Sequence, residues 1–149
     1  MIPPTSHDST TLVIRRMFSA SRLRVFRAWI EPKALEHWFR PRGMGMTVSK
    51  LEACVGGSFR FNLENGSSIL GTYLQVVPPE KLVFTWSGEA IQGRETVVTV
   101  DFLDQGAMTE VVLTHERLRI PEQRALAEGG WSTMFNALAE VLSSPHLNW

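Results

Sequence analysis

Residues 121–142 read PEQRALAEGGWSTMFNALAEVL, and their apolar side chains recur at helical spacing. The segment is therefore predicted to be one helix of roughly 30 Å, since each residue adds about 1.5 Å. Its apolar stripe consists of Trp131, Met134, Phe135, Leu138, Val141 and Leu142. Gly129 and Gly130 lower helix propensity by about 1 kcal/mol each, which predicts either a kink or a bulky group packed against the bare backbone.

Between residues 46 and 116, apolar and polar side chains alternate with the period of two that is typical of β-strands. A strand over residues 46–52 begins this run. Asn65-Gly66 predicts a hairpin turn, and a loop of two or four residues there pairs Phe59 with Thr72 and Phe61 with Leu70. One face of this hairpin then carries Phe59, Phe61, Leu63, Leu70, Leu74 and Val76, and Tyr73 falls on the other face.

Further strands follow the turn at Pro78-Pro79-Glu80. One places Leu82, Phe84 and Trp86 on a single face. The turn at residues 104–107 pairs two more strands, so that a common inner face carries Val98, Val100, Phe102, Val111, Leu113 and His115. The whole run is predicted to be antiparallel, with one apolar and one polar face.

The N-terminal part predicts a strand over residues 10–18 and two short helices. Both faces of that strand are mixed, so its inner face stays open. Ser19 or Ser21 can cap the first helix, and Pro32 can begin the second. The apolar stripes of the two helices consist of Val25, Ala28 and Trp29, and of Leu35, Trp38 and Phe39.

These elements predict an α+β helix-grip architecture, in which a curved antiparallel sheet of about seven strands wraps around the long C-terminal helix. Because a curved sheet and a straight helix diverge, we expect an elongated apolar cavity between them. Residues 10–149 are expected to form a single domain, and residues 1–9 a flexible tail.

Several segments resemble the START-like helix-grip superfamily, in the branch named after the activator of heat-shock-protein-90 ATPase. The resemblance covers roughly residues 10–142, with Glu31 and Phe39-Arg40 departing from the usual pattern, the latter at the expected cavity mouth. It is carried by TLVIRRMFSASRLRVFRAWIEP (11–32), HWFRP (37–41), Gly56-Gly57 with Phe59, Gly71, PPEKLVFTW (78–86), LTH (113–115) and Gly130-Trp131.

The resemblance implies a cavity between the sheet and the last helix. It also implies ligands such as lipids, hydrophobic small molecules or polyketides, and some relatives act as cyclases or dehydratases. In eukaryotic chaperone activators this domain follows a separate N-terminal domain. No such domain precedes it in this sequence, so we expect chaperone activation not to be its role.

The 149 residues are 44% apolar and 20% charged, with a formal net charge of zero, which argues against a nucleic-acid partner. Residues 1–60 nevertheless carry an excess of basic residues, and Arg22, Arg24 and Arg27 could form a basic face. No apolar run is long enough to span a membrane, and the N-terminus lacks a secretory pattern. The single cysteine, Cys54, is expected to be a buried thiol in the cytoplasm.

Candidate ligand-binding residues are the inner-face aromatic residues and one histidine: Trp38, Phe59, Phe61, Phe84, Trp86, Phe102, His115, Trp131 and Phe135. The buried N–H groups of Trp86 and Trp131 need partners from protein, water or ligand. The histidines His7, His37, His115 and His146 share no metal-ligand spacing, so we expect no metal, no cofactor and no catalytic set.

Two polar residues carry open alternatives. His115 is either satisfied by the backbone at a strand end or anchors the oxygen of a ligand. Arg16 either lies in an exposed ion pair or points at an acidic ligand group.

The predicted function is non-covalent binding of a hydrophobic or amphipathic small molecule. An interaction module, either a homodimer or a chaperone partner, is one alternative, and it could use the faces of Val83/Thr85 and Val97/Thr99. A cyclase- or hydrolase-like enzyme is the other, with His115, Arg16 and Glu52 as its candidates.

Overall fold

The computed structural model describes residues 10–88, 94–119 and 121–144. The tail predicted over residues 1–9, together with His7 and His146, lies outside these ranges. A seven-stranded antiparallel sheet has the strand order β1-β7-β6-β5-β4-β3-β2. The elements in chain order are β1 (Leu12–Phe18), α1 (Arg22–Ala28), α2 (Pro32–Trp38), η1 (Pro41–Gly43), β2 (Met46–Leu51), β3 (Ser58–Leu63), β4 (Ser68–Val77), β5 (Lys81–Trp86), β6 (Thr96–Gln105), β7 (Met108–Glu116) and α3 (Pro121–Ser143).

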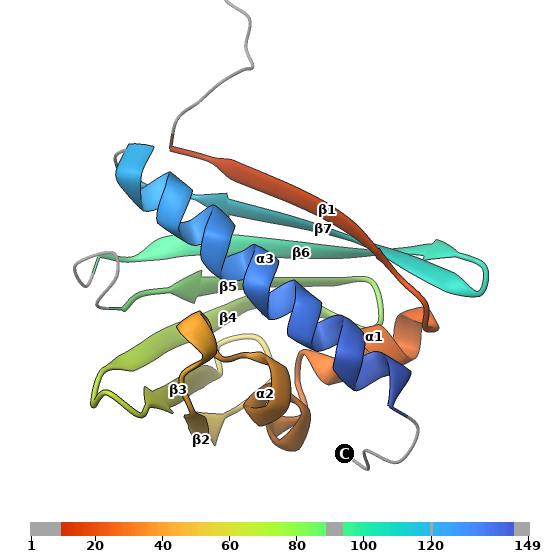
Figure 1. Cartoon of the computed structure of the whole chain (residues 1–149), viewed down its shortest axis with the longest axis horizontal. Coiled ribbons are helices and arrows are strands. Elements are labelled where there is room, and N and C mark those ends of the chain that lie inside the picture. Colours follow the sequence, from red (N-terminus) through yellow and green to blue (C-terminus); the bar gives the residue numbers. More distant parts are fainter. Residues whose placement is uncertain (1–9, 89–93, 120, 145–149) are drawn as a thin grey trace, which may run out of the picture.

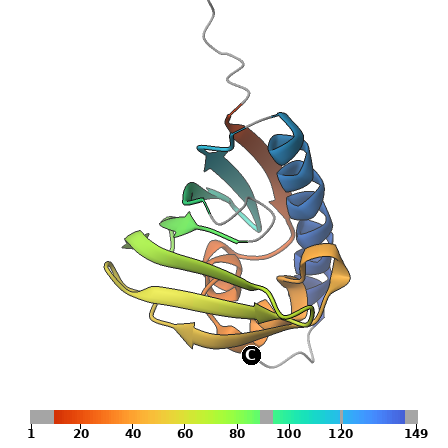
Figure 2. The same cartoon turned by 90° about the vertical axis from the view of Figure 1, so that its left-hand side faces the viewer.

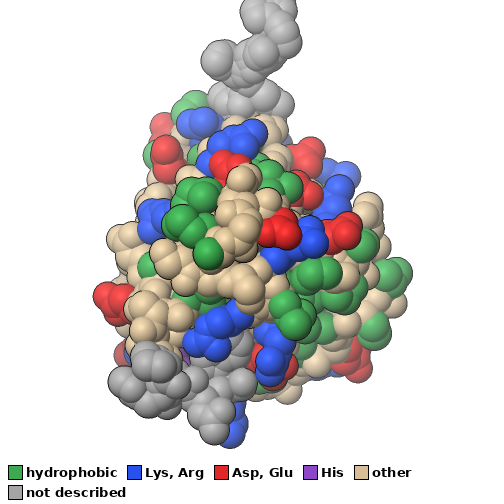
Figure 3. All heavy atoms as spheres, turned by 90° about the vertical axis from the view of Figure 1, so that its right-hand side faces the viewer, with side chains coloured by type: hydrophobic (Ala, Val, Ile, Leu, Met, Phe, Trp, Pro, Cys, Tyr) green, Lys and Arg blue, Asp and Glu red, His purple; other side chains and the backbone are tan. Residues whose placement is uncertain are grey.

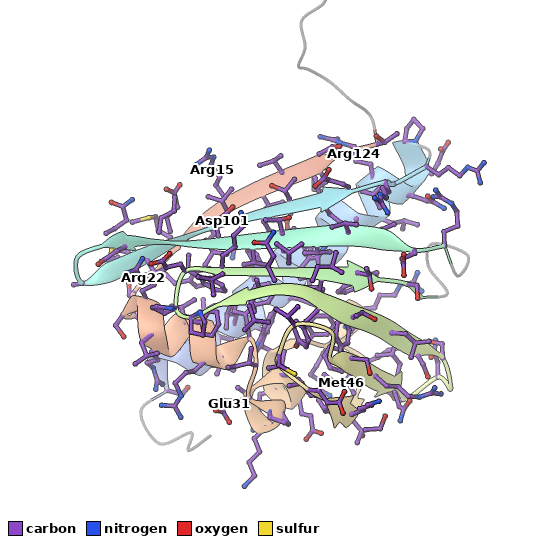
Figure 4. All side chains as sticks on the ribbon, turned by 180° about the vertical axis from the view of Figure 1, so that it is seen from behind. Arg15, Arg22, Glu31, Met46, Asp101 and Arg124 are labelled. Carbon is purple, nitrogen blue, oxygen red and sulfur yellow. The ribbon has the colours of Figure 1, made fainter. Side chains whose placement is uncertain are left out.

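The predicted helix-grip architecture is confirmed. α3 crosses the concave face of the sheet, and α1 and α2 cover the same face (Figure 1). The sheet curls so that β1 and the β2–β3 pair flank α3 on opposite sides (Figure 2). None of the described helices lies on the other face of the sheet, where Arg15 and Asp101 are found (Figure 4). All six residues of the predicted α3 stripe are buried.

The N-terminal elements follow their predicted signals. The hydroxyl of Ser21, and not that of Ser19, caps α1 by accepting the Arg24 N–H at 3.3 Å. Pro32 begins α2. The sequence left open which face of β1 points inward. The structure shows that this face carries Leu12 and Phe18, which are buried, while Val13 and Met17 on the other face are exposed.

The predicted register of the β3–β4 hairpin is wrong by one residue. Phe59 pairs with Gly71 and Phe61 with Ile69, because the Leu63 and Ser67 backbones pair around a three-residue connection. An odd loop reverses the alternation, so Leu70 and Leu74 point outward, at 42% and 46% exposed. Ile69 and Tyr73 point into the core instead, and burial raises the pKa of Tyr73.

A β-bulge between Tyr73 and Gln75 then reverses the alternation again. Val76 therefore returns to the inner face and packs on the core, as predicted, although the register used to predict it was wrong. Across the β6–β7 hairpin the prediction is confirmed, since Val98 pairs with His115 and Phe102 with Val111.

The core between the sheet and the helices is dominated by aromatic rings in mutual contact. Trp29 lies 4.8 Å from Trp38 and 5.9 Å from Trp131, measured between ring centroids. Phe39 contacts Phe61 at 5.0 Å. The indole N–H of Trp38 donates to the Ala28 carbonyl at 2.9 Å, whereas the buried N–H of Trp29 has no hydrogen-bond partner in the described residues. Most of the expected cavity is thus filled by side chains.

The Gly129-Gly130 pair neither interrupts α3 nor contacts a bulky group. The helix is continuous over Pro121–Ser143, and a Cβ built at either glycine would meet no atom within 4 Å. The predicted interruption of the helix is therefore wrong, no described protein group packs against the pair, and both glycines face open space.

Because that space is open, Gly129→Ala and Gly130→Ala should each raise the free energy of unfolding by about 1 kcal/mol through helix propensity alone. Urea denaturation measures this directly. Gly106→Ala is the matched contrast: its φ is +78°, so the same change should lower stability by about 1 kcal/mol. A loss of stability at both helix positions would show that their surroundings are not open.

Three expectations about the surface can be compared with the structure. Cys54 was expected to be buried but is exposed. Val83 and Thr85, suggested for an outer interaction face, are buried. Arg27 of the suggested basic face lies 3.9 Å from the carboxylate of Glu31, and basic and acidic side chains are intermixed at this end of the molecule (Figure 3).

None of the helices in the described ranges is both long and apolar enough to cross a lipid bilayer.

Candidate functional site

A pocket of about 750 Å³ lies between the N-terminal half of α3, the β3–β4 hairpin and the η1 turn. Its volume is in the range of sites that hold small organic ligands. Its lining residues place it toward the N-terminus of α3. There η1 lies beside α3 (Figures 1 and 2).

One wall is a single face of α3. Gln123, Leu126, Ala127, Gly130 and Met134 line the pocket and follow helical spacing, so they share one side of the helix. The apolar stripe of α3 therefore continues N-terminal to Trp131, but there it meets the pocket instead of the sheet. Leu126 is 55% exposed, which places it at the mouth.

The opposite wall comes from the β3–β4 hairpin, through Leu63, Asn65, Ser67, Ser68 and Ile69. The slipped register of this hairpin contributes directly to the site, because it turns Ile69 inward. This wall is apolar at its inner end and polar at its hairpin tip.

The rim is formed by Pro41, Arg42 and Met44. Arg42 has φ 56° and ψ 24°, a left-handed conformation that is uncommon for a residue with a Cβ. Its side chain is exposed and makes no ion pair or hydrogen bond with the described residues.

The floor consists of Trp86, His115 and Trp131. The rings of Trp86 and Trp131 have centroids 5.0 Å apart, and that of His115 lies 5.8 Å from Trp86. The planes of the two indole rings are inclined by 52°, so the floor is a largely apolar, angled surface that suits contact with an apolar or aromatic ligand body.

A chain of hydrogen bonds fixes this floor. The indole N–H of Trp131 donates to Nδ1 of His115 at 3.1 Å. Nδ1 must then lack a proton, so Nε2–H donates to the Thr96 hydroxyl at 2.8 Å. That hydroxyl donates to the Trp86 carbonyl at 2.7 Å. Both ring nitrogens of His115 are thus occupied by protein.

Burial also determines the charge of His115. The residue is 2% exposed, and desolvation lowers the pKa of His115 to about 4. At neutral pH its ring is therefore uncharged, in agreement with the hydrogen-bond pattern.

Comparison with known proteins identifies the family of this chain. The sequence profile described as "Activator of Hsp90 ATPase homolog 1-like protein" matches residues 19–143, which include every residue lining the pocket. The chain belongs to this family. The resemblance seen in the sequence is thereby confirmed.

Solved structures show the same fold. A crystal structure of a Chromobacterium violaceum protein matches with a TM-score of 0.80 at 24% identity, over 91% of this chain and 99% of its own. A Rhodobacter sphaeroides protein matches with a TM-score of 0.80 at 24% identity, over 98% and 99%. DynU16, from the dynemicin biosynthetic locus, matches with a TM-score of 0.78 at 20% identity, over 91% of this chain and 48% of DynU16. No curated protein matches the sequence.

The predicted ligand-binding residues of this protein fall into two groups, those that line the pocket and those that lie in the packed core. Trp86, His115 and Trp131 meet at the floor of the pocket. The others lie in the packed core and do not line the pocket: Trp38, Phe59, Phe61, Phe84, Phe102 and Phe135.

Arg16 does not point into the pocket. Its guanidinium donates to the Asn136 side chain at 2.7 Å and lies 5.7 Å from the Phe135 ring centroid, at the seam between β1 and α3. Glu52 is exposed, accepts the Ser58 N–H at 3.2 Å and lies 3.8 Å from Lys50. Among the three candidates for acid–base chemistry, His115 alone lines the pocket.

The sequence did not predict three parts of the pocket lining: the face of α3 before Trp131, the rim at η1 and the tip of the β3–β4 hairpin. Two signals could have indicated the α3 face. Ala127, four residues before Trp131, continues the apolar stripe beyond its predicted start, and the glycine pair leaves a bare surface beside Trp131. No comparable signal in the sequence marks Arg42.

Proposed function

We propose that this protein binds a hydrophobic or amphipathic small molecule, without covalent chemistry, in the pocket between α3 and the β3–β4 hairpin. The observation that carries the proposal is the open pocket of about 750 Å³ over the Trp86–Trp131 floor. Burial of apolar ligand surface there would supply affinity at about 25 cal/mol per Å².

The site favours binding over acid–base catalysis. His115 is neutral, with both nitrogens engaged, and no carboxylate is among the described residues that line the pocket. An interaction module is favoured less, because Val83 and Thr85 are buried and Val97 and Thr99 are half-buried, so the suggested outer face exposes little apolar surface.

The test uses the neutral fluorescent probe N-phenyl-1-naphthylamine with the full chain. We expect saturable binding that quenches tryptophan emission by energy transfer from Trp86 and Trp131. Native mass spectrometry of the purified protein would reveal a co-purified ligand. Absence of both signals would contradict the proposal.

The substitution Gly130→Leu should place a side chain inside the pocket. Gly130 lines it, and a Cβ there meets no atom, so Gly130→Leu should weaken probe binding at least about tenfold without lowering stability. Ala139→Leu is the matched control, because it adds a leucine to an exposed position of α3 outside the pocket. Equal affinities for the two variants would place the probe elsewhere.

A further inference from the structure

The amide side chains of the pocket present their N–H groups rather than their oxygens. Gln123 is 5% exposed, and its Oε1 accepts the backbone N–H of Arg119 at 2.8 Å. Because a backbone N–H can only donate, this contact fixes which end of the amide is the oxygen. The NH₂ group is left as a donor without a hydrogen-bond partner among the described residues.

Asn65, at the hairpin tip, is arranged in the same way. Its Oδ1 accepts both the backbone N–H and the hydroxyl of Ser67, at 2.9 and 2.7 Å. Its NH₂ group therefore also remains available as a donor. The indole N–H of Trp86, a residue of the floor, is a further donor that makes no hydrogen bond to the described residues.

The described residues that line the pocket carry positive charge and no negative charge. Arg42 is the charged side chain among the described lining residues, and none of them is Asp or Glu. The neighbouring Glu64 lies outside the lining, and its carboxylate accepts the backbone N–H of Gly45. The remaining polar side chains, those of Ser67, Ser68 and Thr133, are neutral hydroxyl groups.

We infer that the ligand is a hydrophobic anion, whose acidic group pairs with Arg42 at the rim while its apolar body covers Trp86 and Trp131 and meets a lining whose free amide and indole groups are donors. Unpaired donors and one guanidinium favour a group that only accepts hydrogen bonds and carries negative charge. This inference rests on the proposed function and narrows it to acids.

A matched pair of probes tests it. 8-Anilinonaphthalene-1-sulfonate has the ring system of N-phenyl-1-naphthylamine with an added sulfonate. We expect the anionic probe to bind more tightly than the neutral one, and its affinity to fall with salt. Arg42→Gln should weaken the anionic probe about three- to tenfold and leave the neutral probe unchanged.

Two further variants sharpen the test. Gln123→Glu keeps an oxygen for the Arg119 N–H but replaces the free donor by a negative oxygen, so it should also weaken only the anionic probe. Arg22→Gln removes the same charge from α1, away from the pocket, and should change neither affinity (Figure 4).

The outcomes separate the two proposals. If neither probe binds, the proposed function fails. If both bind equally well, or if Arg42→Gln weakens both alike, the pocket binds apolar molecules but the assignment of an acidic ligand is overturned.

Discussion

Replacing Gly71 by alanine is expected to lower the free energy of unfolding by about 3 kcal/mol or more, because a side chain there has no space. A Cβ on Gly71 would overlap both the ring of Phe59 and the carbonyl oxygen of Thr85. Phe59 is the cross-strand partner of Gly71 in β3, and its ring lies over the bare backbone. For a chain of this length the melting temperature should fall by about 10 °C.

Gly88→Ala is the matched control, because the nearest contact of its Cβ would be an ordinary 3.4 Å to the Ile69 side chain. It should change stability by less than about 0.5 kcal/mol. Adding Phe59→Leu to Gly71→Ala should restore stability only in part, since the Thr85 carbonyl belongs to the backbone and cannot rotate away. Full tolerance of Gly71→Ala alone would contradict the observed β3–β4 register.

That register marks the limit of what the sequence could predict about the sheet. Alternation defines which residues share a face within one strand, but the relation between strands depends on loop length. Asn65-Gly66 suggested an even loop, and the observed odd connection moved Tyr73 inward and Leu70 outward. Where the turn was placed correctly, at residues 104–107, the shared inner face of Val98 and His115 was predicted correctly, and the two residues pair.

The same limit applies to the pocket. Helical periodicity and strand alternation placed Trp131 and His115 on inner faces, which is correct. Periodicity gives a direction, however, and does not say whether neighbouring rings leave space. Trp29, Trp38 and Phe39 close the centre of the expected cavity, so the open volume lies toward the N-terminus of α3.

The second large effect concerns the buried hydrogen-bond chain beneath the pocket. His115 receives a hydrogen bond from Trp131 at Nδ1, so protonation of the ring would place two N–H groups face to face. Acid should therefore disturb the floor of the pocket as well as the stability of the fold.

The fold should become less stable between pH 6.5 and about pH 4. Desolvation lowers the pKa of His115 from 6.5 to about 4, so in this interval the unfolded chain binds a proton that the folded chain excludes. The contribution of His115 to stability is complete above pH 6.5. It decreases as the pH falls toward 4, by about 3 kcal/mol in total.

Urea denaturation at pH 7.5 and pH 4.5 measures this loss, with His115→Gln as the comparison. A glutamine can accept from Trp131 or donate to Thr96 but does not titrate, so the variant should lose less stability on acidification than the wild type. His37→Gln removes an exposed histidine and keeps the network, so it should respond to acid as the wild type does. Identical acid responses in all three proteins would mean that the charge state of His115 is not coupled to folding. The hydrogen-bond chain that positions Trp131 would then have to tolerate a protonated ring.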